Sequence, residues 1–299
     1  MWPAFIEKRG PIVYNYGMGI TLVYSFISIL IAAVDFIIAA MSFAKKTDQG
    51  RYLGITCITA AVVDCAYLVT TTTDNYFINS VFASIYFAGI SFMLNILVIF
   101  VFVFTNTPRK SLVKTLIKIS LVYLAFEIVI FAINPFKEIV IGYQYRGGVI
   151  SMFSYNMKTL YLMHLCYSYI LVAAVFFMLI YAALRVAWEY KKQYFLCAIA
   201  LGAIVLINSI FLYVPDFGIV GRIDVSVLLY SIAAIFFYWA CFAYPKQWME
   251  GVLKSSIFDS LDLGIILFGY NDNMIFCNEK IKGFIPFLDF EKGGNLDEF

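Results

Sequence analysis

The sequence predicts an all-α polytopic membrane protein, a seven-transmembrane helical bundle, from its composition, its hydropathy and its aromatic content. Of its 299 residues, 63% are hydrophobic and only 13% are charged, whereas soluble domains carry about a quarter charged residues. Apolar stretches of about 20 residues, the length that crosses the hydrocarbon core as a helix, recur along the chain. Aromatic residues make up 19% of the chain, as is common where side chains meet the lipid–water boundary. The lipid bilayer is therefore an expected partner, and the net charge of +2 gives no indication of nucleic acid.

Seven apolar stretches are expected to span the membrane. The first follows a polar and aromatic segment and is longer than the apolar region of a signal peptide, so we expect it to remain as an anchor. The connection after the fourth stretch, from Asn134 to about Thr159, is the longest, and long loops in compact bundles are often lids or binding segments. The expected spans are Met18–Phe43, Tyr52–Thr71, Phe77–Phe104, Leu112–Ile133, Leu160–Leu184, Phe195–Tyr213 and Val225–Tyr244.

The distribution of Lys and Arg predicts the orientation of the bundle. Twelve of these residues lie in the connections after spans one, three and five, in the basic first turns of span four, or in residues 246–261 after span seven, against six on the opposite side. Because cytoplasmic loops carry the excess of positive charge, we expect the N-terminus outside and the C-terminus in the cytoplasm. The first three spans do not resemble the last three, which argues mildly against a transporter built from inverted repeats.

Ionisable side chains within spans are costly in lipid, so each one calls for a functional hypothesis. Asp35 and Asp64 lie in the first two expected spans, and we interpret them as interhelical hydrogen-bonding groups that lock the bundle. Glu127, His164 and Asp224 lie toward the outer end, where they form a candidate site for ligand or proton sensing. Interhelical hydrogen bonding is the alternative for these three residues as well.

The long fourth connection supplies further candidate ligand contacts. Tyr143, Tyr145 and Arg146, together with Tyr155, offer rings for stacking and polar groups for hydrogen bonds to a small ligand. The alternative is an ordered loop that only caps the bundle.

The common catalytic motifs are missing from the sequence, so we expect no catalytic residue, no metal ligand and no cofactor. It contains no nucleophile elbow, HExxH pair, P-loop or dinucleotide glycine motif. His164 is the single histidine, and no cysteine or carboxylate stands at metal-ligand spacing from it. The seventh expected span contains no lysine for a retinal Schiff base.

After the seventh span, residues 246–261 are expected to form an amphipathic cytoplasmic linker helix. Trp248, Val252 and Ile257 fall at roughly helical spacing, and we predict that they couple the signal to the output. The same apolar face suits pairing with a second copy, so we expect a homodimer through this helix. A helix lying on the membrane surface is the alternative.

Residues 262–299 have the pattern of a partial α+β segment. A strand at Gly264–Gly269, a turn at Asn271–Asn273 and a strand at Met274–Cys277 predict a hairpin. Asn278 is then a suitable N-cap for a helix from Glu279. This order resembles the opening of a PAS sensor domain. A complete domain of this kind needs on the order of 100 residues, so we expect an incomplete PAS-like segment.

Four stretches carry a wider resemblance: "INPF" at Ile133–Phe136, "LINSIFLY" at Leu206–Tyr213, "IDVSVLLYSI" at Ile223–Ile232 and "IFDSLDLGIILFGYNDNMIFCNE" at Ile257–Glu279. With seven spans and a PAS start, the chain resembles the seven-helix N-terminal sensor of bacterial histidine kinases, which also precedes GGDEF diguanylate cyclases. One departure follows "INPF", where the resemblance implies a histidine and this sequence has Lys137-Glu138. This member is therefore expected to sense a different ligand if that histidine binds ligand in the family.

The resemblance implies a receptor in the bacterial inner membrane with three parts: a sensor at residues 1–245, a linker helix at 246–261 and the PAS-like segment at 262–299. An unknown small ligand, extracellular or membrane-borne, would act on the bundle, and the linker would pass the signal to a kinase or cyclase beyond this chain. Two alternatives stay open. One is a transporter that uses Asp64 and Glu127 as proton carriers, and the other is a receptor that signals by recruiting a partner.

Overall fold

The computed structural model describes residues 11–106, 110–145, 153–186, 188–213, 229–244, 263–268 and 274–284. The chain divides into two compact units, Met1–Tyr238 and Trp239–Phe299, and each is described by itself. Arg146, Asp224 and the three coupling residues of the expected linker helix, Trp248, Val252 and Ile257, lie outside the described residues.

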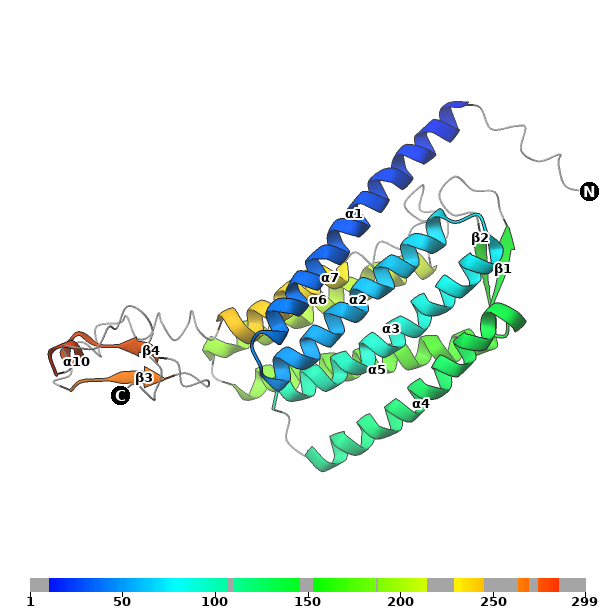
Figure 1. The fold of residues 1–299 in the computed structure, drawn as a ribbon. Helices are drawn as coiled ribbons and strands as arrows, with labels where there is room; N and C mark the ends of the chain where they lie inside the picture. The colour runs from blue at the N-terminus through cyan, green and yellow to red at the C-terminus, as the bar shows by residue number, and fades with distance from the viewer. Residues whose placement is uncertain are drawn as a thin grey trace, which may run out of the picture. The chain divides into compact units, whose positions relative to one another are not determined.

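The first unit is a bundle of helices (Figure 1). Six helices of the described chain are long and apolar enough to cross a membrane, and a shorter apolar helix covers Leu229–Ala243. This agrees with the predicted helical membrane bundle, and the chain is treated below as a multi-pass membrane protein. The helices are α1 (Pro11–Phe43), α2 (Asp48–Thr72), α3 (Tyr76–Phe104), α4 (Lys110–Lys137), α5 (Thr159–Arg185), α6 (Trp188–Tyr213) and α7 (Leu229–Tyr238), which continues in a π-helical turn, Trp239–Ala243.

Helix α3 holds the bundle together, because it contacts α2, α4 and α5, while α7 contacts α1, α2 and α6. The most buried spans are α2 and α3, and α4 is the least buried. Phe100 and Val101 of α3 have no exposed surface. Large apolar side chains such as Phe26, Val122 and Phe177 are 70–73% exposed on the outer helices, as expected for faces that contact lipid rather than water.

Helix α4 ends later than the sequence indicated. The prediction ended the span at Ile133, where the apolar stretch gives way to Asn134. The helix instead continues through Asn134 and Pro135 to Lys137. Pro135 has no N–H group, so the last turn lacks one backbone hydrogen bond, but the N–H of Glu138 still donates to the carbonyl of Asn134 at 2.8 Å. The helix ends where Glu138 takes a positive φ of 47°.

The long fourth connection contains a β-hairpin that the sequence analysis did not predict. Strand β1 (Ile141–Tyr145) pairs antiparallel with β2 (Phe153–Met157), with Ile141 opposite Met157 and Tyr143 opposite Tyr155. The hairpin lies at the end of the bundle where α3 begins and α4 ends (Figure 1). This end is called the hairpin end below.

The second unit contains the hairpin that the sequence predicted, formed by β3 (Ile266–Phe268) and β4 (Met274–Cys277). Asn278 follows β4 and precedes α10 (Glu279–Phe284). Its side-chain oxygen accepts hydrogen bonds from the backbone of Ile265 at 2.8 Å and of Ile281 at 3.3 Å. The residue therefore acts as the predicted N-cap and also ties the helix to the start of the hairpin. That a PAS domain follows the bundle stays a prediction.

Candidate functional site

Two of the predicted site residues meet inside the bundle. Nδ1 of His164, on α5, lies 3.4 Å from Oε1 of Glu127, on α4. Oγ of Ser91, on α3, lies 3.2 Å from the same ring nitrogen. Both ionisable side chains are almost fully buried, with 4% of Glu127 and 6% of His164 exposed. Three helices therefore contribute to one polar cluster at the hairpin end.

Glu127 depends on His164 for its polar contact. Among the described residues, neither carboxylate oxygen of Glu127 has a hydrogen-bond partner by strict geometry. A buried ionisable side chain without a polar partner costs several kcal/mol, and the nearest polar partner of Glu127 lies on another helix. The pair is therefore sensitive to any change that separates α4 from α5.

Aromatic rings enclose the histidine. Phe87 and Phe131 present their edges to the imidazole, with ring centroids 5.8 Å and 5.1 Å away, and Tyr161 lies at 5.6 Å. The cavity next to Glu127 and His164 has a volume of about 10 Å³, which is room for about one water molecule. Therefore a ligand larger than water reaches this pair only if the surrounding elements move.

The residue that leads into the first hairpin lines this cavity. Val140, just before β1, borders the cavity and is 1% exposed, and Ile141 at the start of β1 is fully buried in an apolar cluster with Val140. Movement of the start of the hairpin would therefore move one wall of the cavity.

Asn134 fixes the hairpin to the end of α4. Its Oδ1 accepts hydrogen bonds from the backbone N–H groups of Val140 at 2.8 Å and Ile141 at 3.0 Å. Its Nδ2 donates to the carbonyl of Ile141 at 3.3 Å and to Oη of Tyr143 at 2.9 Å. The side chain is fully buried. Asn134 belongs to the "INPF" stretch, but the sequence analysis gave it no role, because its partners become neighbours only after β1 forms.

The loop tyrosines face each other across the hairpin. The rings of Tyr143 and Tyr155 meet edge to face with centroids 5.7 Å apart. Burial raises the pKa of Tyr143, and burial raises the pKa of Tyr155 to about 12. Both hydroxyls are therefore neutral at physiological pH and act as hydrogen-bonding groups. Of the other predicted loop contacts, Tyr145 ends β1 with its side chain outside the described part, and Arg146 lies outside it altogether.

Glu138 occupies the region where the resemblance implied a histidine. Its carboxylate accepts a hydrogen bond from Oη of Tyr76, and its carbonyl accepts one from Nζ of Lys158. Its side chain thus joins the start of α3 to the turn that leads into β1, and its carbonyl is linked to the residue before α5. This is a connecting role, which the sequence pattern did not indicate.

A second polar group continues from Ser91 toward the middle of the bundle. Nδ2 of Asn95 donates to the carbonyl of Ser91 and to Oη of Tyr167, both at 2.8 Å. Oγ of Ser120 donates to Oδ1 of Asn95 at 2.6 Å, and Tyr167 donates to the carbonyl of Ser120 at 2.8 Å. This polar ladder (Ser91, Asn95, Ser120, Tyr167) joins α3, α4 and α5 below the Glu127–His164 pair.

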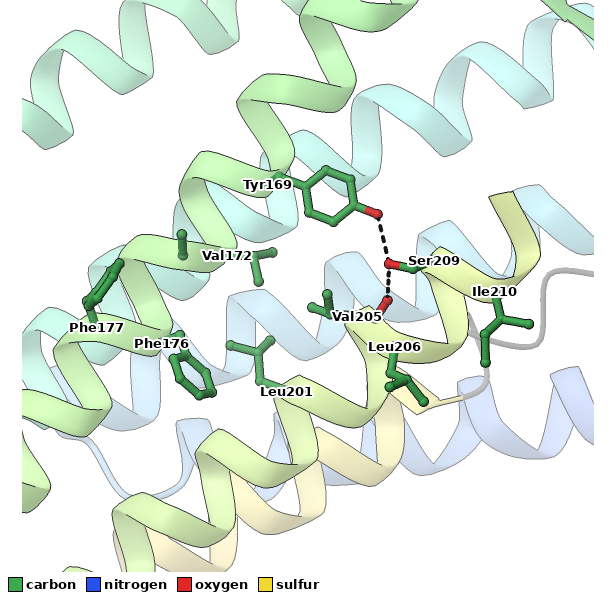
Figure 2. Close-up of a pocket in the computed structure, with 11 residues that line it drawn as sticks. Tyr169, Val172, Phe176, Phe177, Leu201, Val205, Leu206, Ser209 and Ile210 are labelled. Carbon is green, nitrogen blue, oxygen red and sulfur yellow. Dashed lines mark hydrogen bonds between the residues drawn. The ribbon is translucent and has the colours of Figure 1, made fainter. Parts of the chain in front are cut away.

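A larger hollow lies between α5 and α6. It is a groove of about 710 Å³ lined almost entirely by apolar side chains. Figure 2 shows Tyr169 at one end, with its hydroxyl directed toward Ser209; the two oxygens lie 3.3 Å apart. Ser209 in turn donates to the carbonyl of Val205 at 2.8 Å. The sequence analysis did not predict this groove, because small residues such as Gly202 and Ala173 are common in helices whether or not they line a groove.

These features define a class of protein: a multi-pass helical membrane protein with a buried ionisable site beneath an ordered hairpin. The family described as the N-terminal 7TM region of histidine kinase matches residues 12–245. The chain therefore belongs to this family, as the resemblance indicated. A search of the curated proteins found no match to this chain.

Replacing Asn134 tests its role as the clamp of the hairpin. Asn134→Ala leaves two backbone N–H groups without their partner, which lowers the local stability of the hairpin by about 2 kcal/mol. Hydrogen exchange of β1 and β2 amides in the purified chain in nanodiscs measures this change. Asn134→Asp is the matched variant, because it keeps the accepting oxygen while losing the donor to Tyr143. Equal protection in Asn134→Ala and the wild type would contradict the clamp.

Proposed function

We propose that this chain is the sensing part of a membrane receptor for two-component or cyclic-dinucleotide signalling. A small ligand, extracellular or membrane-borne, acts on the bundle, and α7 with the linker at residues 246–261 passes the signal to a PAS domain and then to a histidine kinase or diguanylate cyclase. The receptor lies in a bacterial inner membrane with its N-terminus outside. The family match carries the proposal, because it places the chain among sensor regions of kinases.

The buried pair gives this sensor a physical means of switching. Glu127 and His164 come from different helices and are 3.4 Å apart in a site with almost no exposed surface. A ligand or proton that favours one packing of α4 against α5 shifts the balance between two packings by its difference in affinity for them. A shift of a few kcal/mol changes the ratio of states by orders of magnitude.

The hairpin is the proposed point of access for an extracellular ligand. The cavity at the pair holds only about one water, so binding would involve movement of Val140, which leads into the hairpin. Tyr143, Tyr145, Arg146 and Asp224 remain the proposed ligand contacts at this end. The hydroxyl of Tyr143 already bonds to Asn134, so ligand contact with Tyr143 would act on the clamp.

Glu127→Gln tests the role of the buried pair. The substitution keeps the volume of the side chain and removes its charge, so the proposal expects a change of about tenfold or more in the stimulus needed for half-maximal output. The measurement is autophosphorylation of a fusion of residues 1–261 to a histidine kinase core, over a range of pH and a panel of small polar compounds. Ser120→Ala, lower in the polar ladder, is the control. A response unchanged by Glu127→Gln would count against the pair as the sensing site.

The linker needs a separate test. Changing Trp248, Val252 and Ile257 together to Ser removes the apolar face that the proposal assigns to coupling and to dimerisation. We expect the same fusion to lose its response while still inserting in the membrane, and chemical crosslinking to show less dimer. Full response in the triple variant would exclude this helix as the coupler.

The groove between α5 and α6 is the proposed site for a membrane-borne ligand. Its volume of about 710 Å³ lies within the range of small-molecule sites, and none of the described residues that line it is charged. The occupant would therefore be neutral and lipophilic, with one hydrogen-bonding group near Tyr169 and Ser209.

Gly202→Leu tests the groove. Gly202 lines the groove and a Cβ placed there meets no atom within 4 Å, so a leucine side chain would start in open space and occupy part of the hollow. We expect loss of the response to lipophilic compounds with normal expression and stability. Ala125→Leu, at an exposed position of α4, is the matched control. Retention of every lipophilic response by Gly202→Leu would place the ligand elsewhere.

Two other functions predict different observations. A transporter using Asp64 and Glu127 as proton carriers would move solute in proteoliposomes that contain this chain alone. A receptor that recruits a partner would signal without a kinase or cyclase in the same polypeptide. The family match to a kinase sensor region favours the receptor with an attached output.

A further inference from the structure

A second buried acidic site lies on the other side of α3, away from the Glu127–His164 pair. Asp35 is fully buried on α1. It belongs to a row of buried positions, Ser28, Ala32, Asp35, Ala39 and Ser42, whose spacing of three and four residues places them on one face of the helix. Helix α1 contacts α2 and α7, so this face is turned toward those two helices.

Asp35 links α1 directly to α7. Oγ of Ser231, which is 3% exposed, donates a hydrogen bond of 2.6 Å to Oδ2 of Asp35. The other oxygen, Oδ1, has no hydrogen-bond partner among the described residues. The interhelical bond expected for Asp35 is thus present, but it uses only half of the carboxyl group.

Asp64 of α2 lacks any such bond. It is 1% exposed, and neither of its carboxyl oxygens has a hydrogen-bond partner in the described part of the chain. Asp64 lies on α2, which packs against α1, so these two helices bury two carboxyl groups, of which one oxygen has a polar partner among the described residues. Two negative charges buried on neighbouring helices inside a membrane would be strongly unfavourable.

No basic side chain of the described spans offsets these charges. Within the described side chains of α1, α3 and α7, and in α2 beyond Arg51, there is no Lys, Arg or His. The other titratable groups on these elements are tyrosines and cysteines: Tyr24 on α1, Tyr52, Cys57, Cys65 and Tyr67 on α2, Tyr76 and Tyr86 on α3, and Tyr230 and Tyr238 on α7. None of these carries positive charge, so none of them neutralises the two carboxylates.

We propose that Asp35 and Asp64 together form a binding site for a proton, and that this proton holds α7 against α1 and α2. Proton binding forms one O–H bond on a carboxylate oxygen and removes one negative charge. Asp64 is the residue that carries it, because Ser231 already stabilises the anionic form of Asp35 by donating to it. The protonated Asp64 then has a hydroxyl to donate, and Oδ1 of Asp35 is an acceptor without another described partner.

Release of the proton would weaken the contact between α1, α2 and α7. Two carboxylates in the same apolar surroundings repel, and Asp35 is the acceptor for Ser231 of α7. A like-charge pair of this kind favours any packing that separates the helices or admits water. The site thus gives α7 a second input that is distinct from the proposed ligand site at Glu127 and His164.

Infrared spectroscopy of the purified chain in nanodiscs tests the proton. We expect a carbonyl band of a protonated carboxylic acid that persists well above the ordinary aspartic acid pKa of about 4 and is lost as the pH rises. Asp64→Asn removes this band, and Asp35→Asn moves the pH at which it is lost. Glu127→Gln is the control and leaves the band in place, which separates this site from the proposed ligand site.

Isotope labelling protects the test against a variant that fails to fold. Carboxyl-¹³C aspartate in the wild-type chain shifts the band if an aspartate carries the proton, with no substitution needed. A band that does not shift, or that Asp64→Asn leaves unchanged, would overturn the proposal. The proposal would also be overturned if the band is present in choline chloride and disappears when sodium chloride replaces it, because the site would then hold sodium.

Hydrogen exchange tests the connection to α7. The exchange rate of each α7 peptide in the wild type is divided by its rate in Asp64→Asn at the same pH. Because pH changes the intrinsic exchange of both proteins equally, this ratio reports only the difference between them. We expect this ratio to be near one at low pH and to rise at least severalfold at the pH where the infrared band is lost. A ratio that stays constant across that pH range would show that the proton does not hold α7.

Discussion

A bilayer supplies almost no hydrogen-bond partners, and this constraint governs every polar group inside the bundle. Each ionisable side chain in a span must find its partner on another helix or accept a proton. Glu127 meets His164 across α4 and α5, and Asp35 meets Ser231 across α1 and α7. The polar contacts therefore decide which helices lie together, while the apolar residues decide only that they lie in lipid.

Hydropathy was enough to predict the helices, because an apolar stretch of about 20 residues is stable as a helix in the hydrocarbon core whichever helices it packs against. It did not predict where α4 ends or that a hairpin follows. The Asn134–Pro135 pair is typical of a helix boundary, yet the helix continues through it to Lys137 and ends just before the segment that the side chain of Asn134 binds, at Val140 and Ile141. Such a stop depends on residues that become neighbours only after folding.

The candidate site was predictable to the same limited extent. Glu127 and His164 could be grouped because both lie toward one end of their spans. Ser91, the rings of Phe87 and Phe131, and the clamp at Asn134 could not, since nothing in the sequence states which faces of α3, α4 and α5 meet. Tyr143 and Tyr155 were expected to contact ligand. They are also paired across the hairpin, so each would have to bind ligand while it still packs against the other.

The two buried acidic sites are connected through α3 and α2. Phe87 and Ser91 of α3 both contact His164, and Gly89, between them, faces α2. A Cβ at Gly89 would lie 2.7 Å from Cγ2 of Val63, so the two helices touch here with no room to spare. Val63 precedes Asp64. Because close-packed interiors transmit strain, a shift of α3 at His164 would displace the part of α2 that carries Asp64, and α2 contacts α7.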